Sequence, residues 1–120
     1  MIHYKEYSKK NIKREWITFV HGAGGSSAIW KKQIPFFSKA FNLVLVDLSG
    51  HGYSVSKSNK KSKDKISFES ILDDVLEVLD KLNIKKSHFI GISLGTIVIN
   101  QLVTKEPSRI LKMVLGGATL

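Results

Sequence analysis

Apolar and polar residues follow two different periods along this chain, and the change of period predicts where strands and helices lie. Apolar runs at 16–20, 42–47, 87–91 and 111–115 predict strands. The unbroken apolar character of 42–47 is typical of a parallel strand covered on both faces. Residues 2–7 alternate apolar and polar side chains, and this pattern favours an edge strand.

Between these runs, apolar residues recur at the spacing of a helix. The clearest helix begins after Ser67 as its N-cap, and its apolar stripe consists of Phe68, Leu72, Val75, Leu76, Leu79 and Leu82. A second helix is predicted from Leu94 to about Lys105, ending before Pro107. A third is expected from Ser26 or Ser27 to about residue 40, where Pro35 should kink it or split it.

Strands that alternate with helices imply parallel pairing through right-handed crossovers. We therefore expect an α/β fold with a mostly parallel sheet of about five strands, with three main helices distributed over both faces. The 120 residues contain no internal repeat and no domain linker, so a single domain is expected.

Composition excludes several kinds of site. The chain has no cysteine, which rules out disulfides, thiolate zinc sites and a cysteine nucleophile. No His-x-x-x-His pair occurs, and we expect neither a metal nor a cofactor. No apolar run approaches the ~20 residues of a membrane span. The first residues lack the apolar core of a secretory signal, so a cytoplasmic location is expected.

The net charge is +9, and the basic residues concentrate at 5–14 and 57–65. The second segment has no aromatic residue that could stack on a base. We interpret both as solvated segments, with no nucleic-acid or membrane partner. The alternative is a salt-sensitive association with an anionic partner.

Three glycine-rich loops, 21–27, 48–54 and 91–95, each follow a predicted strand. Sites in open α/β sheets form at the carboxyl ends of strands, so these loops should converge. Ser93 lies between two glycines on a turn from strand to helix, where its oxygen would be exposed beside the positive end of a helix. Acyl transfer would need oxyanion donors, one from the N–H of Leu94 and one from the loop after 16–20.

Three motifs in order resemble the N-terminal half of an α/β-hydrolase of the esterase-like type. They are His21-Gly22-Ala23-Gly24-Gly25, Asp47-Leu48-Ser49-Gly50-His51-Gly52-Tyr53-Ser54 and Gly91-Ile92-Ser93-Leu94-Gly95. The resemblance implies that Ser93 is the nucleophile and that the amides of Ala23 and Leu94 form the oxyanion hole. The loops would be supported by His21, Gly22, Gly24, Asp47, His51, Gly91 and Gly95.

Each of these residues also has a structural interpretation. Ser93 could be a structural serine in a tight turn. His21 and His51 could replace a missing base, but bracing of the backbone is favoured for both. Asp47 is expected to brace a turn rather than act as a base. Trp30 and Tyr53 could contact a substrate, although packing is the default.

The chain departs from the family pattern after Ser93, where the acid and the histidine of a triad should follow. No histidine follows, and the one carboxylate, Glu106, would lie about 18 Å along the helix at ~1.5 Å per residue. We therefore expect residues 1–120 to form the N-terminal part of one hydrolase domain, lacking the cap and the C-terminal strands, with little triad-type activity.

Two alternatives in function stay open. One is a non-catalytic module that associates with itself through an exposed sheet edge. The other keeps the fold with a different chemistry, such as that of a haloperoxidase, a carbon–carbon hydrolase, an acyltransferase or a lyase. If the site were complete, its partner would be a small acyl substrate.

Overall fold

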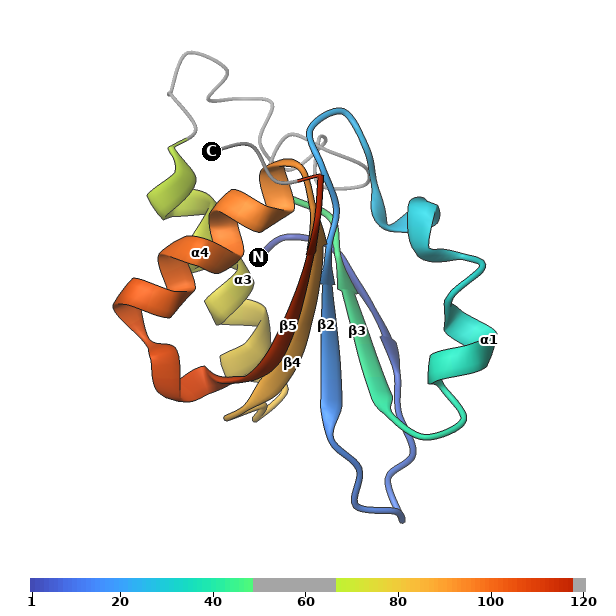
Figure 1. The fold of residues 1–120 in the computed structure, drawn as a ribbon. Helices are drawn as coiled ribbons and strands as arrows, with labels where there is room; N and C mark the ends of the chain where they lie inside the picture. The colour runs from blue at the N-terminus through green and yellow to red at the C-terminus, as the bar shows by residue number, and fades with distance from the viewer. Residues whose placement is uncertain (49–66, 118–120) are drawn as a thin grey trace.

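A computed structural model describes residues 1–48 and 67–117 of the chain, and its centre is one twisted sheet (Figure 1). The strands are β1 (Tyr4–Tyr7), β2 (Trp16–Val20), β3 (Asn42–Val46), β4 (Ser87–Ile92) and β5 (Ile110–Gly116). The helices are η1 (Ser27–Trp30), α1 (Ile34–Phe37), α3 (Phe68–Lys81), α4 (Leu94–Lys105) and η4 (Pro107–Arg109).

The strand order is β1-β3-β2-β4-β5, and every neighbouring pair except β1 with β3 is parallel. The predicted edge strand near the N-terminus is confirmed as β1, which lies antiparallel to β3. The sequence prediction of a mostly parallel α/β sheet is therefore confirmed. Parallel order also brings the carboxyl ends of β2, β3 and β4 to the same edge of the sheet.

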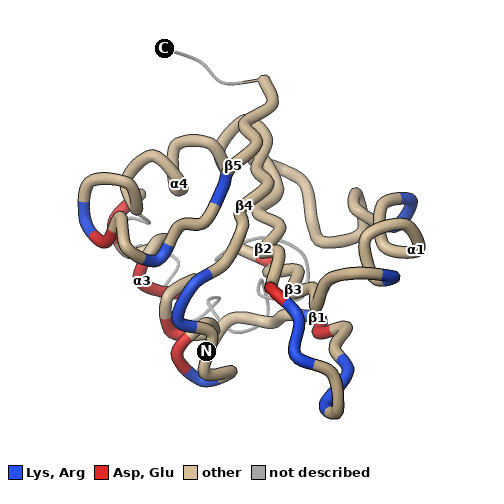
Figure 2. Tube along the Cα trace, turned by 60° about the horizontal axis from the view of Figure 1, so that its bottom comes forward, with Lys and Arg blue, Asp and Glu red and all other residues tan. Residues whose placement is uncertain are grey.

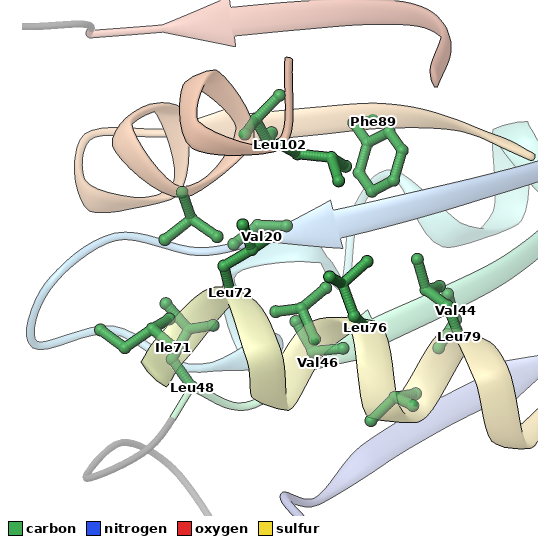
Figure 3. Packing of buried hydrophobic residues seen from close by; sticks show 14 of the residues in the cluster. Val20, Val44, Val46, Leu48, Ile71, Leu72, Leu76, Leu79, Phe89 and Leu102 are labelled. Carbon is green, nitrogen blue, oxygen red and sulfur yellow. The ribbon is translucent and has the colours of Figure 1, made fainter. Parts of the chain in front are cut away.

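Helices cover both faces of the sheet, as predicted. Figure 1 shows α3 and α4 on one side and α1 on the other. The larger core lies on the α3–α4 side, where Val20, Val44 and Phe89 of the sheet pack with Leu72, Leu79 and Leu102 of the helices (Figure 3). The smaller core lies on the α1 side around Ile17, Phe19, Trp30, Leu43 and Leu45. Burial on both sides explains why β3 is apolar at four of its five positions.

Helix α3 begins where the sequence predicts. The Ser67 hydroxyl accepts a hydrogen bond from the Ser70 N–H at 3.0 Å, and the Ser70 hydroxyl accepts one from the Ser67 N–H at 3.2 Å. The predicted stripe is wrong at Phe68, which is 45% exposed. Ile71 and Val78 are buried instead, because the buried face is broader than a single stripe.

The single helix expected from residue 26 to about 40 is not present. Ser26 caps the short helix η1, with the N–H of Ala28 donating to its hydroxyl, and the chain then turns before α1. Pro35 lies in the first turn of α1, where its missing N–H costs nothing. The split that the proline predicted is therefore observed, and the helical segments are shorter than expected.

Charged residues are unevenly distributed over the described ranges. Figure 2 shows Lys and Arg along the connection between β1 and β2, and Asp and Glu along α3. The side chains of Lys5, Lys9, Lys10 and Lys13 are exposed, as expected of a solvated segment. In the part of the chain that the structure describes, no helix is long and apolar enough to span a bilayer.

Candidate active site

Ser93 occupies the turn that joins the end of β4 to the start of α4. Its backbone has φ 51° and ψ −116°, a combination that a residue with a Cβ atom rarely adopts. The Ser93 N–H donates to the Gly116 carbonyl at 3.0 Å. The N–H and the hydroxyl of Thr96 both donate to the Ser93 carbonyl, at 2.9 and 2.6 Å. The turn is therefore held from both sides, and Ser93 itself is exposed.

The two glycines of the turn serve close packing rather than a positive φ. A Cβ atom on Gly95 would lie 2.2 Å from the Val20 carbonyl oxygen, so α4 can start against the end of β2 only with glycine at this position. A Cβ atom on Gly91 would lie 2.6 Å from the Cδ1 of Ile99. The glycines thus let the chain make this bend without Cβ clashes, and the strained dihedral angles themselves belong to Ser93.

The loop after β2 lies directly against Ser93. A Cβ atom on Gly22 would be 3.0 Å from the Cβ and 3.6 Å from the Oγ of Ser93. The Gly25 N–H donates to the Gly22 carbonyl at 3.1 Å, which closes a tight turn with Gly24 at φ 77°. Two of the three predicted loops, 21–27 and 91–95, therefore meet at Ser93.

His21 is fully buried at the start of this loop, with both ring nitrogens in hydrogen bonds. Its Nε2 accepts from the Leu48 N–H at 3.0 Å, so Nδ1 carries the proton and donates to the Gly22 carbonyl at 2.7 Å. The imidazole thus links the end of β3 to the loop that faces Ser93. This arrangement requires the neutral ring.

Asp47 holds the same loop from the end of β3. Its Oδ1 accepts from the Ser27 N–H at 2.7 Å, and its Oδ2 lies 2.7 Å from the Nδ1 of His3. Burial would raise the pKa of this carboxyl, but the hydrogen bonds from Ser27 and His3 outweigh burial and lower the pKa below its usual value. The Asp47 carboxylate is therefore ionised at neutral pH.

The sequence analysis missed two residues that support this site. One is His3, which precedes β1 and whose ring reaches the buried Asp47. No local pattern connects two residues that are 44 positions apart. Thr96 could have been identified, because a threonine three positions after Ser93 can reach back to the Ser93 carbonyl.

The backbone N–H groups of Ala23 and Leu94 have no acceptor among the described residues. Leu94 is the first residue of α4, so its N–H lies at the positive end of the helix. Ala23 follows Gly22, which contacts Ser93. Within residues 1–48 and 67–117, both donors are thus unpaired, and they lie on elements that flank the serine.

The other predicted site residues fall into two groups. His51 and Tyr53 lie outside the described residues, as does the rest of the loop after Leu48. Trp30 is buried against Phe19, with ring centroids 5.1 Å apart, so packing accounts for it. Glu106 lies at the far end of α4 and pairs with Arg109 at 3.1 Å, as expected from its distance along the helix.

Comparison with known proteins identifies the family. Residues 15–120 match the family described as alpha/beta hydrolase fold, and the chain belongs to it. The Agrobacterium fabrum protein RutD, whose name gives it provisionally as a carbamate hydrolase, is 30% identical over 98% of this chain. The 3-oxoadipate enol-lactonase 1 of Acinetobacter baylyi is 28% identical over 85% of the chain. The enol-lactonase structure from Burkholderia xenovorans superposes over 93% of the chain with a TM-score of 0.82 and 26% identity.

The chain spans only part of each of these proteins. It covers 43% of the Agrobacterium protein, 36% of the Acinetobacter lactonase and 41% of the Burkholderia structure. The family match over residues 15–120 includes β2, the Ser93 turn and β5. The relatives are hydrolases by name, and the shared region is the part of their fold described here.

Proposed function

We propose that this chain carries the nucleophile and the oxyanion donors of a serine hydrolase that acts on carboxylic esters or related acyl compounds. The observation that supports this most strongly is the backbone of Ser93, which is strained, exposed and held at the start of α4. Strain of ~1–3 kcal/mol at one residue persists only where the surroundings enforce it, and it is concentrated at functional sites.

The chemistry follows from the geometry. The Ser93 oxygen would attack the substrate carbonyl, and the free N–H groups of Ala23 and Leu94 would donate to the oxyanion that forms. The positive end of α4 would favour the same negative charge. The names of the relatives, which include lactonases and a carbamate hydrolase, support ester-like carbonyls as the substrate class.

A general base must take the Ser93 proton, and the described residues do not supply one. Both nitrogens of His21 are engaged with the backbone, and Glu106 is paired at the other end of α4. We therefore propose that the 120-residue chain reacts slowly. Removal of triad members still leaves ~10³–10⁴-fold catalysis over water in a serine protease, from binding and the oxyanion hole.

A fluorophosphonate probe tests both parts of this proposal. We expect slow labelling of the 120-residue chain, mapped to Ser93 by peptide mass spectrometry and absent in S93A. S108A, which changes an exposed serine near the end of α4, is the matched control and should label like the unmodified chain. Equal labelling of S93A and the unmodified chain would disprove the proposal that Ser93 is the nucleophile. Rapid stoichiometric labelling of the unmodified chain would disprove the proposal that it lacks a general base for Ser93.

The second candidate function is a non-catalytic module of the same fold. The engagement of both His21 nitrogens with the backbone favours it, because this buried histidine then serves the fold rather than proton transfer. The two candidates differ in one measurement, because a non-catalytic module gives no Ser93-dependent labelling under any condition.

A further inference from the structure

The residues just before strand β1 are held against the end of β3. Ile2 is buried in the larger core, and the His3 carbonyl accepts a hydrogen bond from the Asp47 N–H at 2.9 Å. The antiparallel register that pairs Tyr4 with Val46 therefore continues by one residue and places His3 directly opposite Asp47. The backbone thus fixes where the His3 side chain can reach.

The His3 ring makes a second contact with the same residue. Its Nδ1 lies 2.7 Å from the Oδ2 of Asp47, whose side chain is fully buried. An ionised carboxylate can only accept, so Nδ1 of His3 carries the proton and donates. A buried charge needs such donors, and His3 supplies this one from outside the three glycine-rich loops.

The Asp47 carboxylate connects His3 to the loop that faces Ser93. Its other oxygen, Oδ1, accepts from the Ser27 N–H at 2.7 Å. Since one oxygen is bonded to His3 and the other to Ser27, rotation of the carboxylate would break both hydrogen bonds. His3 therefore fixes the direction in which Oδ1 points toward Ser27.

The loop that faces Ser93 is fastened at both of its ends to the end of β3. Its first residue, His21, accepts from the Leu48 N–H at 3.0 Å. Its last residue, Ser27, is the one held by the carboxylate. A shift at this second end would move the Ala23 N–H, which lies between the two ends, relative to the serine.

From these contacts we infer that His3 is a positioning residue of the candidate site. It fixes the Asp47 carboxylate, and through Ser27 it sets the position of the Ala23 N–H relative to Ser93. This inference rests on the proposed function, in which the Ala23 N–H donates to the oxyanion. His3 acts through Asp47 and takes no part in the chemistry itself.

Two substitutions separate the donated hydrogen bond from the volume of the side chain. H3N keeps a nitrogen donor on the γ carbon, where histidine carries Nδ1, whereas H3L fills similar space without a donor. The matched control is H88L, because His88 also pairs with a carboxylate, that of Glu15, at 2.8 Å. His88 lies near the start of β4, at the other end of this strand from Ser93.

Hydrogen exchange followed by NMR tests whether His3 holds the loop. We expect the Ser27 N–H to exchange roughly tenfold faster in H3L than in the unmodified chain, as for loss of a hydrogen bond to a charged group. H3N should restore the rate, and the amides in the centre of β3 should keep theirs. An unchanged Ser27 rate would overturn the inference. A parallel increase in β3 would also overturn it, because His3 would then only stabilise the fold.

Labelling of Ser93 by the fluorophosphonate probe tests the effect on the site. We expect H3L to label roughly tenfold more slowly, less than the ~10²–10³-fold cost of removing an oxyanion donor, because the donor is displaced and not lost. H3N should recover most of the rate, and H88L should label like the unmodified chain. An unchanged rate in H3L, or a loss that H3N does not recover or that H88L shares, would contradict the inference.

A double-mutant cycle tests the route through Asp47. Because His3 acts through this carboxylate, H3L should slow labelling much less in D47N than in the unmodified chain. Effects that multiply would show that His3 acts by another route and would refute the inference. Absence of Ser93 labelling in every variant would refute the proposed function, whereas Ser27 exchange would still decide whether His3 holds the loop.

Discussion

The two sides of the candidate site are built by different means. On one side, the Ser93 turn is held by close packing of backbone, with Gly95 against Val20 and Ser93 bonded to Gly116. On the other, the loop from His21 to Ser27 is held by two buried polar side chains, His21 and Asp47. A strained turn persists only where closely packed neighbours prevent it from relaxing. A loop with little packing of its own is held instead by side chains that form hydrogen bonds with its backbone groups. The two sides should therefore respond differently to changes in volume and to changes in pH.

The largest expected effect on stability comes from placing a side chain in the tightly packed space beside the Ser93 turn. In G95A the new methyl group would have to displace the Val20 carbonyl or the start of α4, because the contact would be 2.2 Å. We expect a loss of about 3 kcal/mol or more in the free energy of unfolding, near the upper end for overpacking. Urea denaturation measures it.

G24A is the matched control for this prediction. Gly24 has φ 77°, but a Cβ atom on it would meet nothing within 4 Å. Its cost should be the ~1–2 kcal/mol of a left-handed residue with a Cβ atom. If G95A is no more destabilising than G24A, the close approach of α4 to β2 does not hold the turn.

The next largest effect is expected at Asp47. D47N keeps the shape of the side chain but removes the charge that accepts hydrogen bonds from Ser27 and His3. We expect a loss of about 1.5–3 kcal/mol at neutral pH, the usual range for a hydrogen bond to a charged group. The control is D73N, which removes an exposed carboxylate of α3 that pairs with Lys105 at 2.9 Å and should change stability by no more than about 1 kcal/mol. A D47N variant as stable as D73N would show that this carboxylate does not hold the loop.

Acid should weaken the loop side and leave the turn side intact. The pKa of Asp47 is lowered in the folded chain, so its contribution is complete above the unfolded pKa of about 3.9 and is lost as pH falls through the lower, folded value. Unfolding at a series of pH values between neutral and strongly acidic should show this loss in the unmodified chain and in T96V. In D47N the free energy of unfolding should depend less steeply on pH. An unchanged dependence would assign the acid sensitivity to other groups.

The smallest expected effect on stability comes from the side-chain hydrogen bond that closes the Ser93 turn. T96V keeps the volume of the buried side chain but removes the hydroxyl that donates to the Ser93 carbonyl at 2.6 Å. The Thr96 N–H still bonds to the same carbonyl, so the cost should be about 0.5–1.5 kcal/mol. T104V, at an exposed position of the same helix, is the control. Equal stability of the two variants would mean that the hydroxyl adds nothing to the turn.

The sequence predicts the strands and two of the helices well because their signals are local. The run 42–47 and the stripe after Ser67 each contain their own period and their own boundaries. The segment after Ser26 was predicted less well, because its apolar residues fit one helix face although the chain turns between Trp30 and Ile34. Pro35 gave the only local indication of that break.

The residues of the candidate site could also be predicted only where their signal is local. The positions of Ser93, Gly22 and Asp47 in their loops follow from motifs that end predicted strands. The contact of His3 with Asp47 could not be read from the sequence, because it joins segments that become neighbours only after β1 pairs with β3. The partners of His21 were hidden for the same reason, since Leu48 reaches it only when β3 lies beside β2.

The sequence by itself determined the family, the order of elements and the serine at the strand-to-helix turn, since all of these are encoded within short segments. The tertiary structure alone decided that Ser93 takes the strained conformation, that Gly95 packs against Val20 and that His3 reaches Asp47. These features depend on where the sheet brings distant backbone together. Their energies come from contacts between segments, and no local pattern records them.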